Sequence, residues 1–380
     1  MSKLYYSLGL MSGTSMDGVD ASIIQSDGEA KYKLIIDKYF EYPQVIYNNL
    51  IKLRDKIKNY KDLKKFSKEI QNVEKEITLF HANSVKKILK KTKVNVDFIG
   101  FHGQTIFHNA KKKISRQLGD GKLLSKLTKK TVVNKFRQND LKNGGEGAPL
   151  TPIFHKLLVE KKKIKTPVII INIGGITNYT LIWQDHKISS QIHLTSKDTG
   201  PGNCLIDQWM RKNTDKLYDK NGNIAKLGNI NKEVYGKFFN TFSYKRSYDL
   251  KDFNLKLFKK ISLEDGAATL TELTVDTLIR DILDWLKKTN WHKTIDILLC
   301  GGGRKNNFLV SRIKKKINSS KFIEKKTSVK LIDNLGIDGD FVESQAFAYL
   351  AIRSYLKLPI SFPETTGVSN PCTGGKIISN

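Results

Sequence analysis

One local pattern occurs twice in this chain and limits the folds that the chain can adopt. Residues 8–24 (LGLMSGTSMDGVDASII) and residues 167–183 (PVIIINIGGITNYTLIW) each read as an apolar strand, a polar turn containing glycine, and a second strand. A third strand follows each hairpin, at residues 33–40 and in the segment that ends QIHLTS. We therefore expect a pseudo-duplicated α/β protein whose two lobes face a shared cleft.

Helices and buried strands fill the rest of the chain. Apolar residues at helical spacing predict two helices between residues 44 and 91 and a long amphipathic helix over residues 262–288. Apolar runs predict buried strands at residues 94–100, 131–134, 294–300 and 329–332. We expect residues 1–140, joined by residues 347–380, to form the first lobe, and residues 141–346 to form the second, with a hinge-like loop at residues 144–149.

The composition is typical of a globular protein with a large core. The chain has 380 residues, 39% of them hydrophobic, and no stretch of the roughly 18 uncharged apolar residues that a membrane span requires. The N-terminus lacks the basic and apolar regions of a secretory signal, so we expect a cytoplasmic protein. Three cysteines without CxxC spacing indicate neither a disulfide framework nor a zinc site.

The formal net charge of +29 raises the question of a nucleic-acid partner. The lysines are spread in short runs, as at residues 111–113, 161–163 and 314–316, which is typical of a solvated surface. We therefore expect no nucleic-acid or membrane partner, but a general attraction for anionic small molecules. A nucleic-acid binder stays as an alternative that a salt-dependent shift with DNA would test.

The first glycine-bearing turn is a candidate phosphate site. Its residues Gly13, Thr14, Ser15, Asp17 and Gly18 offer backbone N–H groups, two hydroxyls and glycines that let the backbone approach a phosphate chain. A tight hairpin needs glycine for the same steric reason, so both interpretations stay open. The turn is neither a P-loop nor a dinucleotide fingerprint, because GxxxxGK[ST] and GxGxxG are absent from it.

A second polar cluster is expected at the carboxyl end of the strand near residue 100, where open α/β sheets present ligand-binding groups. The segment GFHGQTIFH places His102 and Gln104 there as candidate substrate contacts, although a structural role for His102 is an equal alternative. Two histidines spaced by six residues are weak grounds for a metal site. In the following FRQND segment, Arg137 suits a carboxylate and Asp140 could hold sugar hydroxyls.

Asp198, in the segment KDTGPGN, is the candidate catalytic residue. We expect it to follow a strand and to precede a loop of fixed geometry, where its carboxylate could act as a general base. The alternative is that it only caps the Gly-Pro-Gly turn. Asn203 is expected to cap the helix that follows.

Two C-terminal segments supply further candidates. The strand at residues 294–300 opens into Gly301, Gly302 and Gly303, a surface on which adenine or ribose could lie, with Asn306 donating or accepting hydrogen bonds. Three consecutive glycines exceed what a tight turn requires. Glu343 lies near an expected helix start and could reach the cleft.

Together these segments resemble the anhydro-N-acetylmuramic acid kinase family. The motifs occur in the family's order over essentially the whole chain: MSGTSMDGVD, HGQTIFH, FRQND with GGEGAP, NIGGITN, DTGPGN with Asp207, CGGGRKN and GIDGDFVESQAFA. The resemblance implies an actin-like, ribonuclease-H-like ATPase fold with ATP in the cleft between the lobes. It also implies that the protein opens the ring of 1,6-anhydro-N-acetylmuramic acid with water and phosphorylates O6 during peptidoglycan recycling.

The resemblance assigns roles residue by residue. Asp198 matches the general base. The residues assigned to ATP are Gly13, Thr14, Ser15, Met16, Asp17, Gly18, Val19, Asp20, Gly174, Gly175, Gly301, Gly302, Gly303 and Asn306. Those assigned to the sugar are His102, Gln104, Arg137, Asp140 and Glu343. No metal site of the chain itself is expected, and Mg²⁺ would come with the ATP phosphates.

The chain departs from the family pattern at three places. Glu146 stands where glutamine is usual, Ser344 replaces an alanine, and the segment at residues 245–253 (KRSYDLKDF) lacks a proline. These departures affect the expected loop contacts and the expected oligomeric state. A homodimer is one possible oligomeric state. Two other functions remain as alternatives: a kinase of an ordinary sugar hydroxyl and a non-enzymatic, actin-like ATPase module.

Overall fold

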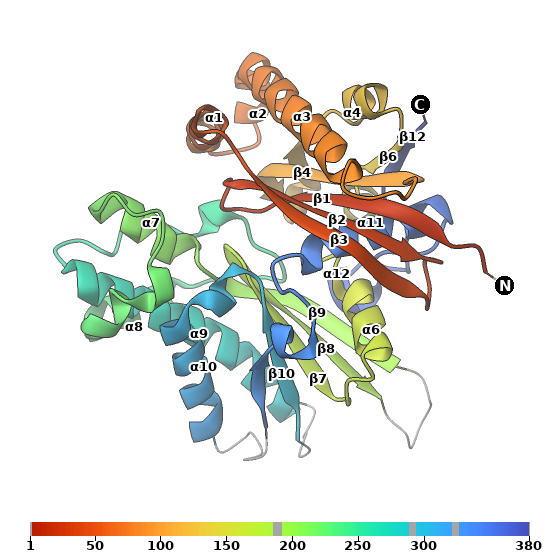
Figure 1. Cartoon of the computed structure of the whole chain (residues 1–380). Coiled ribbons are helices and arrows are strands. Elements are labelled where there is room, and N and C mark those ends of the chain that lie inside the picture. The colour runs from red at the N-terminus through yellow and green to blue at the C-terminus, as the bar shows by residue number, and fades with distance from the viewer. Residues whose placement is uncertain (1, 185–191, 289–293, 321–326, 380) are drawn as a thin grey trace. The chain divides into compact units, whose positions relative to one another are not determined.

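The computed structural model describes residues 2–184, 192–288, 294–320 and 327–379, which fall into two compact units (Figure 1). The first unit consists of Met1–Ile164 and Asp340–Asn380, and the second of Lys165–Gly339. Within the described residues, no helix is both long enough and apolar enough to cross a membrane.

The sheet of the first unit has the strand order β12-β6-β4-β1-β2-β3, and β5 pairs with β4. Strands β1, β2 and β3 form an antiparallel meander, while β4 runs parallel to both β1 and β6. The strands are β1 (Tyr5–Ser12), β2 (Gly18–Ser26), β3 (Tyr32–Glu41), β4 (Phe98–Asn109), β5 (Ile114–Leu118), β6 (Thr131–Asn134) and β12 (Lys376–Ile378).

The sheet of the second unit repeats this plan with the order β11-β10-β7-β8-β9. Strands β7, β8 and β9 form the meander, and β10 runs parallel to β7 and β11, as β4 does to β1 and β6. The strands are β7 (Val168–Ile173), β8 (Ile176–Gln184), β9 (Ile192–Pro201), β10 (Asp296–Cys300) and β11 (Val329–Leu331). The expected α/β class and the duplication of its plan are confirmed.

Helices cover both faces of the first sheet. Alternation along β1 directs Leu8 and Leu10 into an apolar core with α1 and α3, and directs Gly9 toward α11 (Figure 1). The helices of this unit are α1 (Gln44–Lys56), α2 (Asp62–Lys65), α3 (Ser67–Leu89), α4 (Gly121–Thr128), α5 (Gln138–Lys142), α6 (Pro152–Lys161), α11 (Val342–Tyr355) and α12 (Pro363–Thr366).

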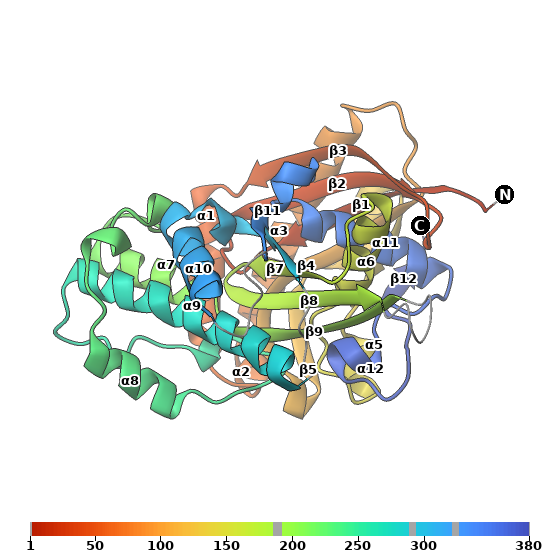
Figure 2. The same ribbon diagram turned by 90° about the horizontal axis from the view of Figure 1, so that it is seen from below.

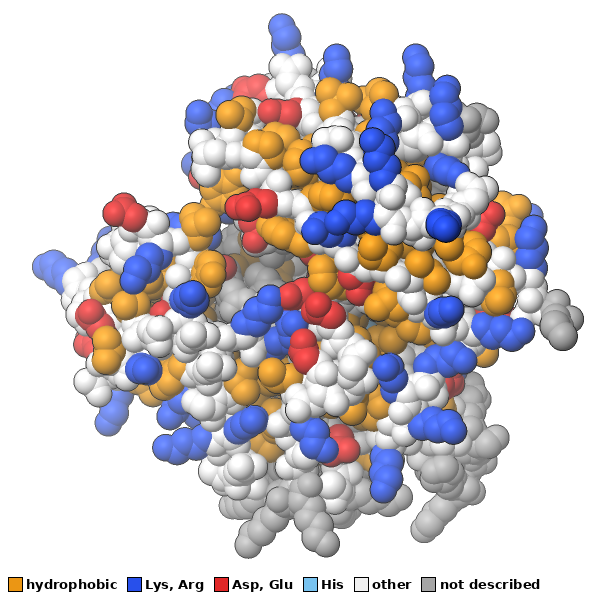
Figure 3. Space-filling view, in the orientation of Figure 1, with side chains coloured by type: hydrophobic (Ala, Val, Ile, Leu, Met, Phe, Trp, Pro, Cys, Tyr) orange, Lys and Arg blue, Asp and Glu red, His pale blue; other side chains and the backbone are white. Residues whose placement is uncertain are grey.

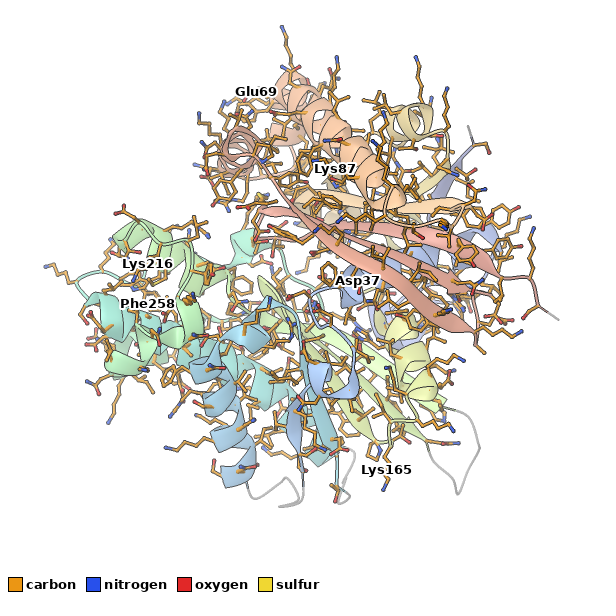
Figure 4. The ribbon with its side chains drawn as sticks, viewed as in Figure 1. Asp37, Glu69, Lys87, Lys165, Lys216 and Phe258 are labelled. Atoms are coloured by element: carbon orange, nitrogen blue, oxygen red, sulfur yellow. The ribbon has the colours of Figure 1, made fainter. Side chains whose placement is uncertain are left out.

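In the second unit, α9 and α10 pack on the face of the sheet that carries Ile169 and Ile171 (Figure 2). A separate aromatic cluster packs against α7 and α8 and includes Phe258 (labelled in Figure 4). The ring centroids of Phe258 and Trp209 are 5.9 Å apart. The helices are α7 (Cys204–Asn213), α8 (Lys232–Thr241), α9 (Leu263–Lys288) and α10 (Asn307–Ser319). Short 3₁₀ helices occur at Ala110–Lys112, Lys220–Gly222, Ala225–Leu227, Leu250–Asp252, Gly302–Lys305 and Ile332–Leu335.

The unit boundaries lie at residues 164/165 and 339/340, whereas the sequence analysis placed them at 140/141 and 346/347. Helix α6 belongs with the first unit because Phe154 packs against Tyr349 and Tyr32, with ring centroids 5.7 and 5.4 Å away. The glycine-rich loop before α6 is also tied to the first unit, since the Glu146 backbone N–H donates to the Thr366 carbonyl at 2.8 Å.

A polar network fixes the start of α11 on the meander. Asp37 on β3 accepts hydrogen bonds from Ser22 Oγ at 2.5 Å and from Gln345 Nε2 at 2.9 Å (Figure 4). The Ser22 hydroxyl also lies 2.6 Å from that of Ser344. Ser344, one of the departures from the family pattern, therefore adds a buried hydrogen bond between α11 and β2.

Replacing Gly9 with alanine should destabilise the first unit. An added Cβ would lie 1.9 Å from the Ser344 carbonyl oxygen of α11, and helix backbone cannot yield as a flexible side chain can. We expect Gly9→Ala to lower the free energy of unfolding by about 3 kcal/mol in urea titrations. Gly236→Ala is the control, because a Cβ within α8 meets no atom within 4 Å. It should stabilise by about 0.5–1 kcal/mol, and equal effects of the two changes would contradict this packing.

Four buried histidines should make stability depend on pH. Burial lowers the pKa of His81 to about 4 and of His108 and His155 to about 3, and holds that of His102 well below its usual value. The folded rings stay neutral while the unfolded chain takes up protons below about pH 6.5, so stability is lost as the pH falls.

We expect the free energy of unfolding to fall between pH 7 and pH 5 by on the order of 1–2 kcal/mol per buried histidine. Urea unfolding at pH 7, 6 and 5 measures this loss. The His155→Gln variant, which lacks one titrating ring, should show a loss smaller by one histidine's share. A free energy that stays constant over this range would contradict the prediction.

Candidate functional site

The turn between β1 and β2 is the first candidate phosphate site. The Met16 backbone N–H donates to the Gly13 carbonyl at 3.2 Å, and the Tyr42 N–H donates to the Asp17 carbonyl at 2.8 Å. The left-handed residue of this turn is Met16 (φ 61°), and neither Gly13 nor Gly18 has a positive φ. Met16 and Val19 are fully buried, so their side chains belong to the core.

The surroundings of the two glycines of this turn differ. A Cβ on Gly18 would lie 2.5 Å from the Phe40 carbonyl oxygen, so the fold itself requires glycine there. A Cβ on Gly13 would meet only Ser15 Oγ, at 3.6 Å, which is ordinary contact. The fold leaves open space beside Gly13, as close approach of a ligand to the backbone requires.

Buried side chains anchor this turn from below. Gln104 on β4 donates from Nε2 to the Gly13 carbonyl at 2.9 Å, while its buried Oε1 has no hydrogen-bond partner among the described residues. Ser12 Oγ lies 2.9 Å from the Tyr42 hydroxyl and 3.2 Å from His81 Nε2. Tyr42 and His81 were missed from the sequence because they lie 30 and 69 residues from Ser12, and only the fold brings them to the turn.

The side chains of His102 and Arg137 are hydrogen-bonded to each other. The His102 ring bonds the Gly103 carbonyl through Nδ1 at 2.8 Å and lies 2.9 Å from Arg137 Nη2 through Nε2. Burial and the adjacent guanidinium hold the pKa of His102 well below its usual value, so the neutral ring accepts from Arg137. Arg137 Nη1 also donates to the Gly147 carbonyl at 2.7 Å. His102 therefore orients Arg137.

Asp140 holds a loop in place. Its Oδ1 accepts from the Gly147 backbone N–H at 2.6 Å, and its Oδ2 accepts from the Thr366 hydroxyl. The side chain is 1% exposed. The structure thus gives Asp140 a role in shaping the 144–147 loop. Glu343 lies, as expected, in the first turn of α11 and is partly exposed.

The GFHGQTIFH cluster and Asp198 both lie inside strands. The sequence analysis had expected them at or after the ends of strands. The cluster falls within β4, which continues to Asn109 because β5 pairs with it antiparallel. Asp198 lies within β9 opposite Asn178 of β8. A β-bulge follows at once, because Thr177 pairs with Gly200 and leaves Thr199 as the extra residue. Bulges of this kind redirect side chains next to active sites.

Asp198 is held by a neighbouring loop. Its Oδ2 accepts a hydrogen bond from the Tyr248 backbone N–H at 3.0 Å, and its own N–H donates to the Arg246 carbonyl at 3.0 Å. These contacts come from the segment at residues 245–253, the part of the chain that departs from the family's proline-containing loop. The carboxylate is 5% exposed and fixed in orientation, as a positioned base requires.

A row of polar side chains crosses the second sheet. Asn172 of β7 pairs with Asn178 of β8, which pairs with Asp198 of β9. Residues directly opposite on neighbouring strands share a face, and this face is the one turned away from the isoleucines that contact α9 and α10. The two asparagines of the row were not singled out from the sequence. The NIGGITN segment contains both, but their alignment appears only with the strand register.

The turn between β7 and β8 is braced by the start of α7. The Gly175 carbonyl accepts from the backbone N–H groups of Gly202 and Cys204 at 2.9 and 3.2 Å. A Cβ on Gly174 would meet only the Ile176 carbonyl oxygen, at 3.4 Å. Asn203 occupies the N-cap position of α7 but makes no side-chain cap; its Nδ2 donates to the Ile173 carbonyl at 3.3 Å instead.

The fold requires two of the three consecutive glycines after β10. Gly301 has φ 77° and no room for a Cβ beside Asn172, and a Cβ on Gly303 would lie 2.3 Å from the Ile173 side chain. A Cβ on Gly302 would meet no atom within 4 Å. Asn306 caps α10, since its Oδ1 accepts from the Leu309 N–H at 3.0 Å.

Arg304 holds the glycine run in place. Its Nη1 donates to the Gly301 carbonyl at 3.1 Å, and its Nε and Nη2 form a bidentate pair with Asp333 at 2.7 and 2.8 Å. The hydrogen bonds from Arg304 lower the pKa of Asp333. The CGGGRKN motif carries this arginine directly after the glycines, so the spacing could have indicated it.

The distribution of charged side chains bears on nucleic-acid and metal binding. On the face drawn in Figure 3, Lys and Arg side chains are scattered among acidic and apolar ones instead of forming one stripe. Over the described parts of the chain, no group of three or more His, Cys, Asp or Glu side chains is arranged to hold a metal ion.

Comparison with known proteins gives one family throughout. A sequence model described as anhydro-N-acetylmuramic acid kinase matches residues 5–380. The protein of that name from Pelagibacter ubique (strain HTCC1062) is 51% identical over 385 residues, covering 100% of both chains.

Two more distant relatives carry the same name. The protein from Zymomonas mobilis subsp. mobilis is 37% identical, covering 97% of this chain and 98% of its own. The protein from Agrobacterium fabrum is 34% identical, with both chains covered fully. The matches run the length of the chain. This chain belongs to the anhydro-N-acetylmuramic acid kinase family.

Proposed function

We propose that this protein uses ATP and water to convert 1,6-anhydro-N-acetylmuramic acid into N-acetylmuramic acid 6-phosphate and ADP. Full-length membership of the family carries the proposal. The fixed carboxylate of Asp198 beside a β-bulge supplies the base that such a reaction needs. The reaction would belong to the recycling of peptidoglycan in the cytoplasm, and it requires neither nucleic acid nor a membrane.

The proposed chemistry couples two bond changes. Asp198 takes a proton from water, and the water oxygen forms a bond to the anomeric carbon while the bond from that carbon to O6 breaks. The freed O6 forms a bond to the γ-phosphorus of ATP, and the bond from that phosphorus to the β-γ bridging oxygen breaks, giving ADP. The proton on Asp198 then passes to solvent.

ATP binding is supported by glycines that the fold itself does not require. Gly13, Gly174 and Gly302 each leave space where a Cβ would otherwise stand, and backbone N–H groups in such turns suit phosphate oxygens. We propose these three glycines as ATP contacts. Mg²⁺ bound to the phosphates would neutralise their charge during transfer.

The substrate's lactyl carboxylate requires a cationic partner. We propose Arg137 for this role, because its planar guanidinium suits a carboxylate. His102 and the Gly147 carbonyl hold that guanidinium in a fixed orientation. Gln104 would act through the Gly13 carbonyl that it binds, and Asp140 through the loop that it shapes.

Gly302→Ala tests the proposed ATP contact. Because a Cβ at this position meets no atom of the chain, the thermal unfolding midpoint should stay unchanged while the KM for ATP rises by roughly tenfold. The KM for the sugar should not change. Gly303→Ala, in contrast, should lower the thermal unfolding midpoint, since the Ile173 side chain occupies the space that the Cβ would need. An unchanged ATP KM in Gly302→Ala would contradict the contact.

Asp198→Asn tests the base. Asparagine keeps the shape and can still accept from the Tyr248 N–H, so the fold and ATP affinity should be retained. We expect kcat to fall by about 10²–10⁴, the range for loss of a general base. Near wild-type turnover would rule out this role for Asp198.

The reaction itself is tested with the anhydro sugar and ATP in ¹⁸O-labelled water, followed by mass spectrometry. The expected product carries one ¹⁸O at the anomeric carbon and an unlabelled phosphate on O6. Phosphorylation only of plain hexoses or N-acetylhexosamines, without incorporation of solvent oxygen, would support a kinase of ordinary hydroxyls instead.

A further inference from the structure

We propose that Asn178 positions the attacking water together with Asp198, an inference that rests on the proposed function. Asn178 and Asp198 are direct cross-strand partners of β8 and β9. Side chains in this relation share a face of the sheet, with Cβ atoms about 4.5–5.5 Å apart. A water molecule can bridge two polar groups at that separation.

The side-chain oxygen of Asn178 lacks a partner. Its Oδ1 is buried, and within the described chain nothing donates a hydrogen bond to it. The neighbouring Thr177 is fully buried at the bulge, and its hydroxyl also has no hydrogen-bond partner among the described residues. Leaving a buried acceptor unsatisfied costs about 1–3 kcal/mol, so such groups in native proteins usually mark a water, an ion or a functional contact.

The missing partner of Asn178 Oδ1 is a hydrogen-bond donor, and a water molecule supplies two O–H donors. One O–H of the water would donate to the Asp198 carboxylate, which takes that proton as the bond to the anomeric carbon forms. The other O–H would donate to Asn178 Oδ1 and stay on the oxygen that becomes the product hydroxyl. With both O–H groups directed, a lone pair of the water points away from the sheet toward the sugar, and atoms and charge balance as in the proposed reaction.

The alternative is that Asn178 is only a strand residue. Asn172 of the same row has a structural neighbour, because its Oδ1 occupies the place where a Gly301 Cβ would stand. Asn178 makes no comparable contact through its oxygen. Other cross-strand pairs that involve β8 and β9 on this face are satisfied, as when Ser196 opposite Thr180 donates to the Tyr179 carbonyl at 2.5 Å.

The charged groups around Asp198 decide how a pH profile is interpreted. On its own strand, Lys197 forms an ion pair with Asp281 of α9 at 2.8 Å. On the adjacent loop lie Arg246 and the Tyr248 phenol, whose pKa burial raises. These groups are present in every variant below, so a change in the acidic limb of kcat between variants reports on the pair at positions 178 and 198.

Two substitutions and one control test the proposal. Asn178→Ala removes the acceptor, and the isosteric Asn178→Asp replaces it with a second carboxylate opposite Asp198. Thr180→Val is the control, since Thr180 lies on the same strand and the same face, two residues farther along. Initial rates are measured against sugar, ATP and pH, and thermal unfolding is followed for each variant.

We expect Asn178→Ala to lower kcat by about 100-fold with both KM values within threefold of wild type. In Asn178→Asp, like-charge repulsion should raise the apparent pKa of the acidic limb of kcat by about one pH unit. Thr180→Val should keep the wild-type kcat and the wild-type apparent pKa of its acidic limb. A structural role alone would lower the unfolding midpoint without moving that limb, so the pH profile remains decisive if the alanine variant folds poorly.

Three results would overturn the proposal: an alanine variant with kcat within threefold of wild type, a raised sugar KM with unchanged kcat, or an acidic limb that does not move in Asn178→Asp. Failure of the proposed function itself is distinguishable. In that case the wild-type protein would leave solvent ¹⁸O out of the anomeric position, whereas a wild-type protein that incorporates it beside an unaffected alanine variant contradicts only the role of Asn178.

Discussion

The buried central strand of each sheet is the constraint on which the other features depend. Strands β1 and β7 each pair antiparallel with the next strand on one side and parallel with a later strand on the other. Neither strand can shift register without moving apolar side chains out of the core. The turn that follows each central strand is therefore fixed, and it is at these turns that Gly13 and Gly174 leave open space.

The sequence alone was sufficient for the fold plan because it repeats. Two hairpins with a third strand, followed by helices and buried strands, leave few arrangements other than the duplicated sheet that is observed. The predicted ends of strands were less accurate. The GFHGQTIFH segment was expected at the carboxyl end of a strand, yet β5 pairs with it and extends β4 to Asn109. A partner strand is not visible in a local pattern.

Side-chain roles depended on contacts between residues distant in sequence. Asp140 and Asn306 are polar residues close to glycine-rich segments, and this favours ligand binding in a sequence. The structure shows Asp140 holding its own loop and Asn306 capping α10. Tyr42 and His81 were missed because each contacts Ser12 from a distant part of the chain. What the sequence could not supply in each case was the partner.

The glycines show how a ligand-related residue can be distinguished from a structural one. Gly301 and Gly303 are explained by backbone geometry and by contacts with β7, so a tight turn accounts for two of the three consecutive glycines. Gly302 has neither reason, and Gly13 differs from Gly18 in the same way. Glycine costs backbone entropy, so in a turn where the fold itself does not require it, close approach of a ligand to the backbone is a candidate cause. A ligand that approaches the backbone would supply that cause, and this is why we propose the nucleotide contact at these glycines and not across the whole of each motif.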